Sequence, residues 1–226
     1  MHNGIPQPAA AGPVPSVALP ARPGREDVDP VLAEYRPRRL VVAGTDADLA
    51  AVLVRLLRTD QLGTEVGFVP ASRRSAAAAA WGLPVGRKAA AAVAFSGHAE
   101  PVPLIRDDAG GVLVGRGEIP RLTGEVYCDE HLVLRGYARR LVAVPGPWGV
   151  AATARRGRFH PERRVRPVPV TAPRGRGSAA GRAVQVGGLP FRVTSDGVEH
   201  PREVRRWAWY RHTEDWLLVR PQPARR

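Results

Sequence analysis

The chain has 226 residues, of which 44% are hydrophobic and 24% are charged. This composition excludes a collagen-like chain, a disulfide scaffold and a fully disordered protein. The formal net charge of +13 would attract phosphate groups or an anionic membrane surface. Lys88 is the only lysine, so the arginine excess is typical of a GC-rich genome and is weak evidence for a nucleic-acid partner.

The single cysteine and the apolar runs indicate the compartment in which the protein works. Cys128 stands alone, which excludes an internal disulfide and a cysteine zinc site and suits a reducing cytoplasm. The longest uncharged apolar run, residues 75–86, is too short to span a bilayer. We therefore expect a cytoplasmic protein, and its positive charge leaves association with a membrane surface open.

The first 34 residues are rich in proline and alanine. Prolines at positions 5, 8, 13, 15 and 20 oppose helix formation. Few side chains in this stretch could offset the entropy cost of ordering the chain. We therefore expect a disordered tail over residues 1–34, with a linker as the alternative.

A strand, a tight turn and a helix are expected after the tail. Residues 40–43 form a short apolar run of β-branched character, which is typical of a buried parallel strand. The chain then turns at Gly44, and from Asp46 onward apolar residues recur at intervals of three and four. This spacing predicts one apolar stripe on a helix.

The same pattern is repeated further along the chain. A second strand is expected at residues 66–69, followed by a loop and an alanine-rich helix that ends at Gly82. Another helix is expected at residues 88–95. Residues 35–100 are therefore predicted to form a small Rossmann-like α/β domain of the nucleotide-binding type.

Short strands separated by glycine, proline and aspartate are expected from residue 101 onward. An Arg/Gly-rich loop at residues 155–182 interrupts them. Residues 101–220 are therefore predicted to form a larger, β-sandwich-like domain, followed by a tail at residues 221–226, so the fold class is α/β plus β. The expected strands are residues 102–105, 111–114, 124–128, 141–144, 150–153, 183–186, 191–193, 204–210 and 216–219.

The first turn resembles a known motif. Residues 41–49 resemble the strand, Gly-Gly-Asp-Gly-Thr turn and helix of the diacylglycerol kinase catalytic domain, within the lipid kinase and NAD kinase superfamily. In that family the turn lets the backbone approach the ATP phosphates at a helix N-terminus. Gly44 matches the first glycine, and Asp46 matches the aspartate. The positions that depart from the pattern are Thr45, Ala47 and Asp48.

Two further stretches follow in the order that the family has. Residues 69–84 are similar to its Ile-Pro-Leu-Gly-Thr-Gly-Asn-Asp segment and the Leu-Gly-Ile-Pro behind it, with matching flanks and a different centre. Residues 191–198 resemble the strand that leads into an Asp-Gly-Glu motif, where Asp196 and Gly197 match and Val198 replaces the glutamate. The residues at the changed centre of the second stretch are Ser72, Arg73, Arg74, Ser75 and Ala76.

This resemblance implies a chemistry. It implies ATP and Mg²⁺ as cofactors and a lipid hydroxyl as the acceptor, with catalytic roles for Asp46 and Asp196. Losing glycines from a phosphate turn places Cβ atoms where the backbone must approach the ligand. A non-catalytic relative, or pseudokinase, of the same fold is therefore the alternative. The residues that correspond to the cofactor-binding turns are Gly44, Thr45, Asp48, Ser72, Arg73, Arg74 and Ser75.

Each candidate also has a purely structural explanation. Asp46 suits a helix cap, and Asp196 suits an Asp-Gly hairpin turn, which tolerates positive φ angles. Arg73 and Arg74 fit a solvated loop, although in a phosphate site they would either exclude ATP or clamp its phosphates by paired hydrogen bonds. Local sequence leaves these alternatives open.

Other polar segments offer weaker signals. Residues 155–182 contain Arg-Gly runs that could follow nucleic-acid phosphates or an anionic membrane, and the alternative is an exposed loop in an arginine-rich chain. Asp107 and Asp108 suit a hairpin connection, with a metal-binding pair as the alternative. The histidines lack the spacing of metal ligands, so we assign no metal-binding residue.

Overall fold

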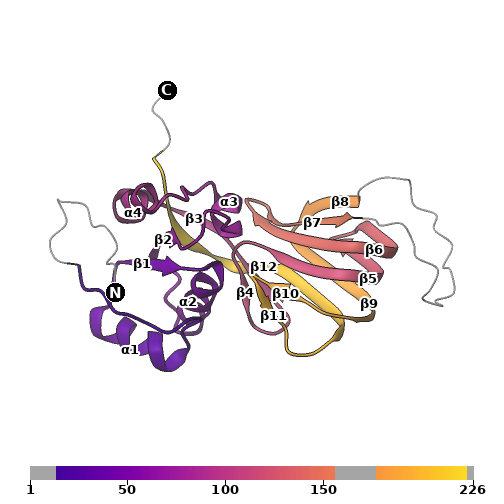
Figure 1. Ribbon diagram of the computed structural model, residues 1–226, viewed down its shortest axis with the longest axis horizontal. Coiled ribbons are helices and arrows are strands. Elements are labelled where there is room, and N and C mark those ends of the chain that lie inside the picture. Colours follow the sequence, from indigo (N-terminus) through magenta and orange to yellow (C-terminus); the bar gives the residue numbers. More distant parts are fainter. Residues whose placement is uncertain (1–13, 156–176, 223–226) are drawn as a thin grey trace. The chain divides into compact units, whose positions relative to one another are not determined.

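The computed structural model describes residues 14–155 and 177–222. The chain divides into two compact units (Figure 1). Unit 1 comprises residues 1–104 and 213–226, and unit 2 comprises residues 105–212. Two long strands, β3 (His98–Asp107) and β12 (Val204–Arg220), contribute residues to both units.

Unit 1 is the α/β part that the sequence predicts. Strands β1 and β2 pair in parallel, from Arg39 opposite Glu65 to Gly44 opposite Pro70. Strand β12 continues this parallel arrangement, because its Leu217 and Leu218 pair with the start of β2. The elements of this unit before β3 are α1 (Arg25–Tyr35), β1 (Arg39–Gly44), α2 (Asp46–Arg58), β2 (Glu65–Pro70), α3 (Ala76–Trp81) and α4 (Arg87–Ser96).

Helices α2 and α4 are stabilised by the apolar side chains that they bury against strands β1 and β2. In α2 the expected stripe is buried, with Leu49, Leu53 and Leu56 fully enclosed. Helix α4 instead buries small alanines, among them Ala90 and Ala94, and they pack in one cluster with Val69 of β2. Small side chains let the helix backbone approach the strand closely.

All of helix α1 except Tyr35 lies inside the segment for which the sequence predicts a disordered tail, and the structure corrects that expectation. Its apolar side chains Val28 and Leu32 are each only 2% exposed. Asp29 on the same helix binds Arg55 of α2 through two hydrogen bonds of 2.8 Å. The helix tolerates Pro30, since burial and this ion pair offset the lost backbone hydrogen bond.

Unit 2 is a large antiparallel β region. Along the sheet the order is β12, β9, β5, β6, β7, β8, and each neighbouring pair is antiparallel. The short strands β10 and β11 form the hairpin expected around Asp196, and β10 also pairs with β5. The strands are β4 (Val112–Leu113), β5 (Gly117–Cys128), β6 (His131–Gly146), β7 (Gly149–Arg155), β8 (Gly177–Gly181), β9 (Ala183–Phe191), β10 (Thr194–Ser195) and β11 (Val198–Glu199).

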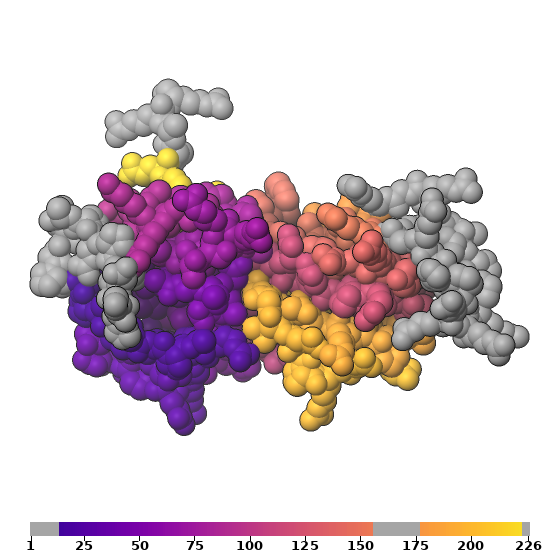
Figure 2. All heavy atoms as spheres, viewed as in Figure 1, coloured from indigo at the N-terminus to yellow at the C-terminus, as the bar shows by residue number. Residues whose placement is uncertain are grey.

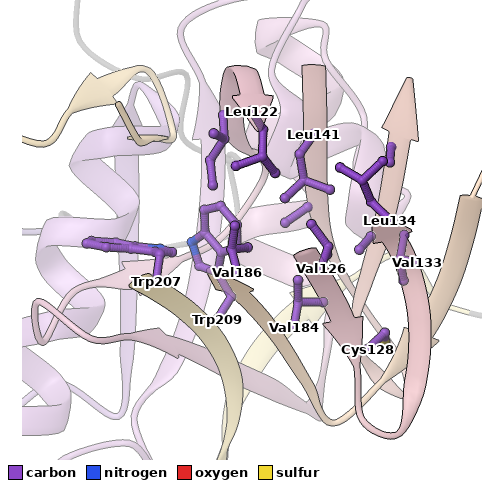
Figure 3. Packing of buried hydrophobic residues seen from close by; sticks show 14 of the residues in the cluster. Leu122, Val126, Cys128, Val133, Leu134, Leu141, Val184, Val186, Trp207 and Trp209 are labelled. Carbon is purple, nitrogen blue, oxygen red and sulfur yellow. The ribbon is translucent and has the colours of Figure 1, made fainter. Parts of the chain in front are cut away.

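One hydrophobic core fills unit 2. Trp207 and Trp209 point into it from β12, and Leu122, Val126 and Leu141 point into it from β5 and β6 (Figure 3). Alternation along β12 explains why the tryptophans are buried while Ala208 between them is only partly covered. The strand expected at residues 204–210 is present as the first part of β12.

Two boundaries differ from the predicted ones. The strands expected at 204–210 and 216–219 are one continuous strand, β12, whose end belongs to unit 1. Strand β8 lies within the expected Arg/Gly-rich loop. The central part of that loop, residues 156–176, lies outside the described residues.

Candidate functional site

The first candidate turn joins β1 to α2 and is closed by its own side chains. Thr45 is the N-cap of α2, and its hydroxyl accepts a hydrogen bond from the Asp48 amide at 3.3 Å. In return, Asp48 Oδ2 accepts the Thr45 amide and hydroxyl, both at 2.8 Å. A Cβ atom on Gly44 would lie 2.6 Å from Asp48 Oδ2, so only glycine allows this carboxylate to come so close.

The second candidate turn joins β2 to α3 and lies beside the first one. The Ala71 amide donates to the Gly44 carbonyl at 2.7 Å, which ties the two turns together just beyond the paired strand ends. Ser75 is the N-cap of α3, and its hydroxyl accepts the Ala78 amide at 2.9 Å. Ser72 Oγ accepts the Arg74 amide at 3.1 Å.

Asp46 connects the two turns through its side chain. It is the first residue of α2, yet its carboxylate accepts the Ser75 hydroxyl and the amides of Ala76 and Ala77, the amides at 2.7 and 3.2 Å. Asp46 therefore caps α3, thirty residues away, whereas Thr45 caps α2. The sequence predicts that Asp46 caps the helix in which it lies, α2. In the structure it caps α3 instead.

Asp48 also holds a segment that the sequence analysis did not connect with the site. Its Oδ1 accepts the backbone amide of Arg22 at 2.7 Å. Burial by itself raises the pKa of Asp48, but the hydrogen bonds from Arg22 and Thr45 and the nearby Arg22 charge outweigh it and hold the pKa below its ordinary value. The carboxylate is therefore ionised at neutral pH and tied to both groups.

These contacts decide what the two turns can bind. The amides of Thr45, Ala76 and Ala77 are the donors that a phosphate would use at a helix start. Each already donates to a carboxylate of this chain. The site thus carries its own anions where the family resemblance implies phosphates.

The same contacts bear on the Mg²⁺ that the resemblance implies. Mg²⁺ takes oxygen ligands, usually one or two carboxylates together with phosphates. Asp46 and Asp48 each accept three hydrogen bonds, which leave about one of the roughly four lone-pair sites of each carboxylate for a metal. No group of three or more possible metal ligands occurs among the described residues. The residues present do not fit a magnesium site in this arrangement.

Arg73 and Arg74 are the exposed part of the second turn. Both side chains are solvent-exposed, and neither guanidinium forms an ion pair with a carboxylate of the described residues. A guanidinium group can bind a phosphate through two parallel hydrogen bonds. In the resembled segment the position of Arg74 is a glycine and that of Arg73 a threonine, so this turn presents two charged side chains where that segment has none.

Asp196 belongs to unit 2 and is held by the backbone of its own unit. It sits in the turn between β10 and β11 with φ of 49°. Its two carboxylate oxygens accept the amides of Val114, Gly115 and Arg116, each at 2.8 Å. The hairpin that the sequence predicts is therefore confirmed, and Asp196 fastens it to the β4–β5 connection.

The remaining polar candidates have structural roles as well. Asp107 is 5% exposed and accepts the amides of Ala109 and Gly111 in the hairpin after β3. Burial raises its pKa above the ordinary value, against those hydrogen bonds. Asp108 accepts the amide of Ala208. Cys128 is buried, which raises the pKa of its thiol, as expected for an unreactive core residue.

The structure thus brings seven of the expected site residues together with Asp46, at the ends of β1 and β2. They are Gly44, Thr45, Asp48, Ser72, Arg73, Arg74 and Ser75. Asp196 lies in the other unit. Arg22 is the residue that sequence reasoning missed, because a single backbone amide leaves no signal in composition or periodicity. Within the described residues, no helix is long and apolar enough to cross a membrane.

Comparisons with known proteins agree with this arrangement at the level of the fold. No protein family model and no curated protein matches the sequence. A crystal structure of a diacylglycerol kinase from Bacillus anthracis str. Sterne matches with a TM-score of 0.59 and 9% identity, over 87% of this chain and 82% of that one. An NAD kinase from Archaeoglobus fulgidus in complex with ATP matches with a TM-score of 0.51 and 10% identity, over 82% and 78%. The chain has the fold of these diacylglycerol and NAD kinases.

Proposed function

We propose that this chain is a non-catalytic relative of the diacylglycerol and NAD kinases, which binds a phosphate-bearing ligand at the turn of residues 72–75 without transferring phosphate. The observation that carries the proposal is the hydrogen bonding of Asp46. Its carboxylate accepts a hydroxyl and two amides from the start of α3. A carboxylate bound in this way holds the two turns together, and only about one of its roughly four lone-pair sites is left for a nucleotide or its metal.

The ligand class follows from Arg73 and Arg74. These exposed guanidinium groups stand at the end of β2, and ligands of α/β sheets bind beyond the carboxyl ends of parallel strands. Because the solved NAD kinase with this fold was determined in complex with ATP, ATP is the first phosphate-bearing ligand to test. Arginine side chains would replace backbone amides as the phosphate contacts.

The experiment is a titration of Mg²⁺ and ATP into the purified protein, followed through the thermal midpoint at low and moderate salt. A ligand that binds only the folded state stabilises it by about 2.7 kcal/mol at one hundred times its Kd. We expect a saturable rise that persists at moderate salt. Changing Arg73 and Arg74 together to alanine should abolish it.

A matched control distinguishes specific binding of ATP by Arg73 and Arg74 from attraction by the net positive charge of the protein. Arg205 and Arg206 are also adjacent and exposed, so changing both to alanine removes the same charge from unit 2. This control should retain the ATP-induced rise. Equal losses in the two double variants, or a rise that disappears with salt, would show that ATP is attracted only by net charge.

An active lipid kinase is the second candidate. The position of Asp46 favours it, since this carboxylate directly follows β1, where the resembled family has its aspartate. A lipid hydroxyl as acceptor, an anionic membrane surface and a cytoplasmic location belong to this candidate. Its signature would be the transfer of phosphate from ATP to a lipid, lost when Asp46 is changed to asparagine.

A further inference from the structure

Strand β1 lies at the edge of the parallel sheet in unit 1. Among the described residues its one neighbouring strand is β2, and Figure 1 draws β1 on the side of β2 that is away from β12. Helices cover the faces of this sheet, with α2 on one face and the purple α4 on the other (Figures 1 and 2). What the described residues leave open on β1 is therefore its outer edge.

The backbone groups of β1 face β2 and the open edge in alternation. The Glu65 amide donates to the Arg38 carbonyl at 3.0 Å, and the Ala71 amide donates to the Gly44 carbonyl at 2.7 Å. Every second residue of a strand turns its amide and carbonyl to the same side, so the even-numbered residues from 38 to 44 face β2. The residues whose amides and carbonyls face the open edge, where no described strand pairs with them, are Arg39, Val41 and Ala43.

This edge lacks the features that usually protect a sheet edge, which are projecting charges, prolines and bulges. The apolar run of residues 40–43 occupies it, with Val41 only partly buried and Ala43 exposed. Arg39 is the one charged residue within β1, and its guanidinium is turned back onto Glu65 and the carbonyls of Phe95 and Gly97. An apolar edge of this kind is suited to pairing with another strand.

The charges at the two ends of β1 indicate which strand fits. Arg38 precedes β1, and its side chain is 94% exposed. Its contact with Glu65, at 3.8 Å, is to a carboxylate that Arg39 already binds at 2.7 Å. Asp46 and Asp48 follow β1 at the start of α2. A basic start and an acidic end attract each other when two copies of β1 run antiparallel, and like charges would meet if they ran parallel.

We propose that the open edge of β1 is a dimerisation surface, on which β1 of a second copy pairs antiparallel about a two-fold axis at Val41. The two Val41 residues then exchange both N–H···O bonds, and Arg39 of each copy does the same with Ala43 of the other. Arg38 of each copy lies opposite Gly44 of the other, beside the turn that leads to Asp46. The two sheets become one continuous sheet. This inference does not depend on ligand binding at the turns.

Sedimentation equilibrium of the full-length protein gives the first test. We expect a monomer–dimer equilibrium in the wild type. Arg38→Glu places a negative charge beside the acidic end of the other copy and should raise the dimer dissociation constant about tenfold. The control Arg205→Glu makes the same charge change at an exposed position of unit 2 and should change the constant less than about twofold. A wild type that is monomeric at every concentration, or equal effects of both substitutions, would overturn the proposal.

Two cysteine variants test the pairing register. In the proposed dimer the Cα atoms of the two residues 41 are about 5.5 Å apart, which a disulfide can bridge. The two residues 43 are separated by four positions along the strand, about 13 Å, and cannot be bridged.

After mild oxidation, Val41→Cys should therefore form a covalent dimer on a non-reducing gel and Ala43→Cys should not, while Cys128 stays buried in both. Equal cross-linking of the two variants, or none in Val41→Cys, would contradict pairing at the β1 edge. Because Val41 packs against the cluster of α4, thermal melting checks that Val41→Cys is folded. If it is not folded, the sedimentation of Arg38→Glu against Arg205→Glu decides.

Discussion

Asp46 shows how one carboxylate can replace a ligand. The starts of α2 and α3 lie at the same edge of a parallel sheet, and both have amides that lack a partner within their own helix and so favour negative charge. Asp46 and Asp48 supply that charge from within the chain. The two carboxylates therefore stabilise the turns in place of a bound anion. They also occupy the positions from which an anion would contact these amides.

The first prediction concerns the stability that Asp46 provides. Asp46→Ala leaves the start of α3 without its acceptor, including the Ser75 hydroxyl of a side chain that is 7% exposed. Loss of a cap and of charge-assisted hydrogen bonds should lower the free energy of unfolding by about 2 kcal/mol. Urea denaturation measures this, with exposed Ser72→Ala as the control, expected to change it by less than about 0.5 kcal/mol. Equal losses in both variants would contradict the linking role of Asp46.

The second prediction concerns the pH dependence that Asp107 causes. Burial raises the pKa of Asp107 in the folded state above its ordinary value of 3.8, so folding favours the protonated form. Its contribution to stability is present below pH 3.8 and is lost as the pH rises through the higher, folded-state pKa. Asp107→Asn keeps an oxygen that can accept the amides of Ala109 and Gly111.

The variant should therefore gain stability relative to the wild type as the pH rises from acid to neutral. Urea denaturation of both proteins at matched pH values gives the difference in unfolding free energy. A difference that stays constant with pH would show that Asp107 has no raised pKa in the folded protein.

At the scale of elements, the spacing between α4 and β2 depends on small residues. A Cβ atom on Gly67 of β2 would lie 2.5 Å from the Ala94 carbonyl oxygen and 2.9 Å from the Ala94 Cα. Gly67 is thus required by close approach of helix and strand backbones. Alanines on the facing side of α4 serve the same purpose.

The third prediction follows from this close approach. Gly67→Ala should lower the free energy of unfolding by about 2 kcal/mol, because the helix must move away from the sheet. Gly63→Ala is the matched control, since a Cβ there meets nothing within 4 Å, and it should be neutral or slightly stabilising. Thermal melting checks both, at about 2–4 °C per kcal/mol for a chain of this size. A similar melting temperature for both variants would contradict the packing argument.

Periodicity made the regular elements predictable from sequence. Helix α2 and strands β1 and β2 follow from apolar spacing alone. Helix α1 was not predicted, because Pro30 and several charged residues surround its buried apolar residues Val28 and Leu32 in the sequence. Strand β12 was expected in two pieces because polar residues around Glu214 interrupt it, at the place where it leaves one unit and enters the other.

The sequence was sufficient to predict where the candidate site lies. It was not sufficient to predict which residues form hydrogen bonds there. Flanking strands and helices place the two turns, so residues near Gly44 and Arg73 could be named from sequence. The partner of Asp46 lies 29 residues away at Ser75, and that of Asp48 lies 26 residues away at Arg22. Such hydrogen bonds leave no local pattern, and only the folded backbone brings them together.

At the scale of the whole molecule, the sequence features that determine the fold differ from those that phosphoryl transfer needs. Identities of 9% and 10% with the solved kinases are sufficient for the fold, because burial patterns tolerate many sequences. Phosphoryl transfer is far less tolerant, since it depends on placing charges around the nucleotide. A chain can therefore keep the architecture while its own carboxylates bind the amides at the starts of α2 and α3.

We propose above that this chain binds a phosphate-bearing ligand without transferring phosphate. The most direct test incubates the full-length protein with γ-labelled ATP, Mg²⁺ and vesicles that contain diacylglycerol and an anionic phospholipid, with NAD as a second acceptor. We predict no labelled product above the background of protein-free samples. Labelled lipid or NADP that forms with wild-type protein and is lost with Asp46→Asn would contradict the account and establish the chain as an active kinase.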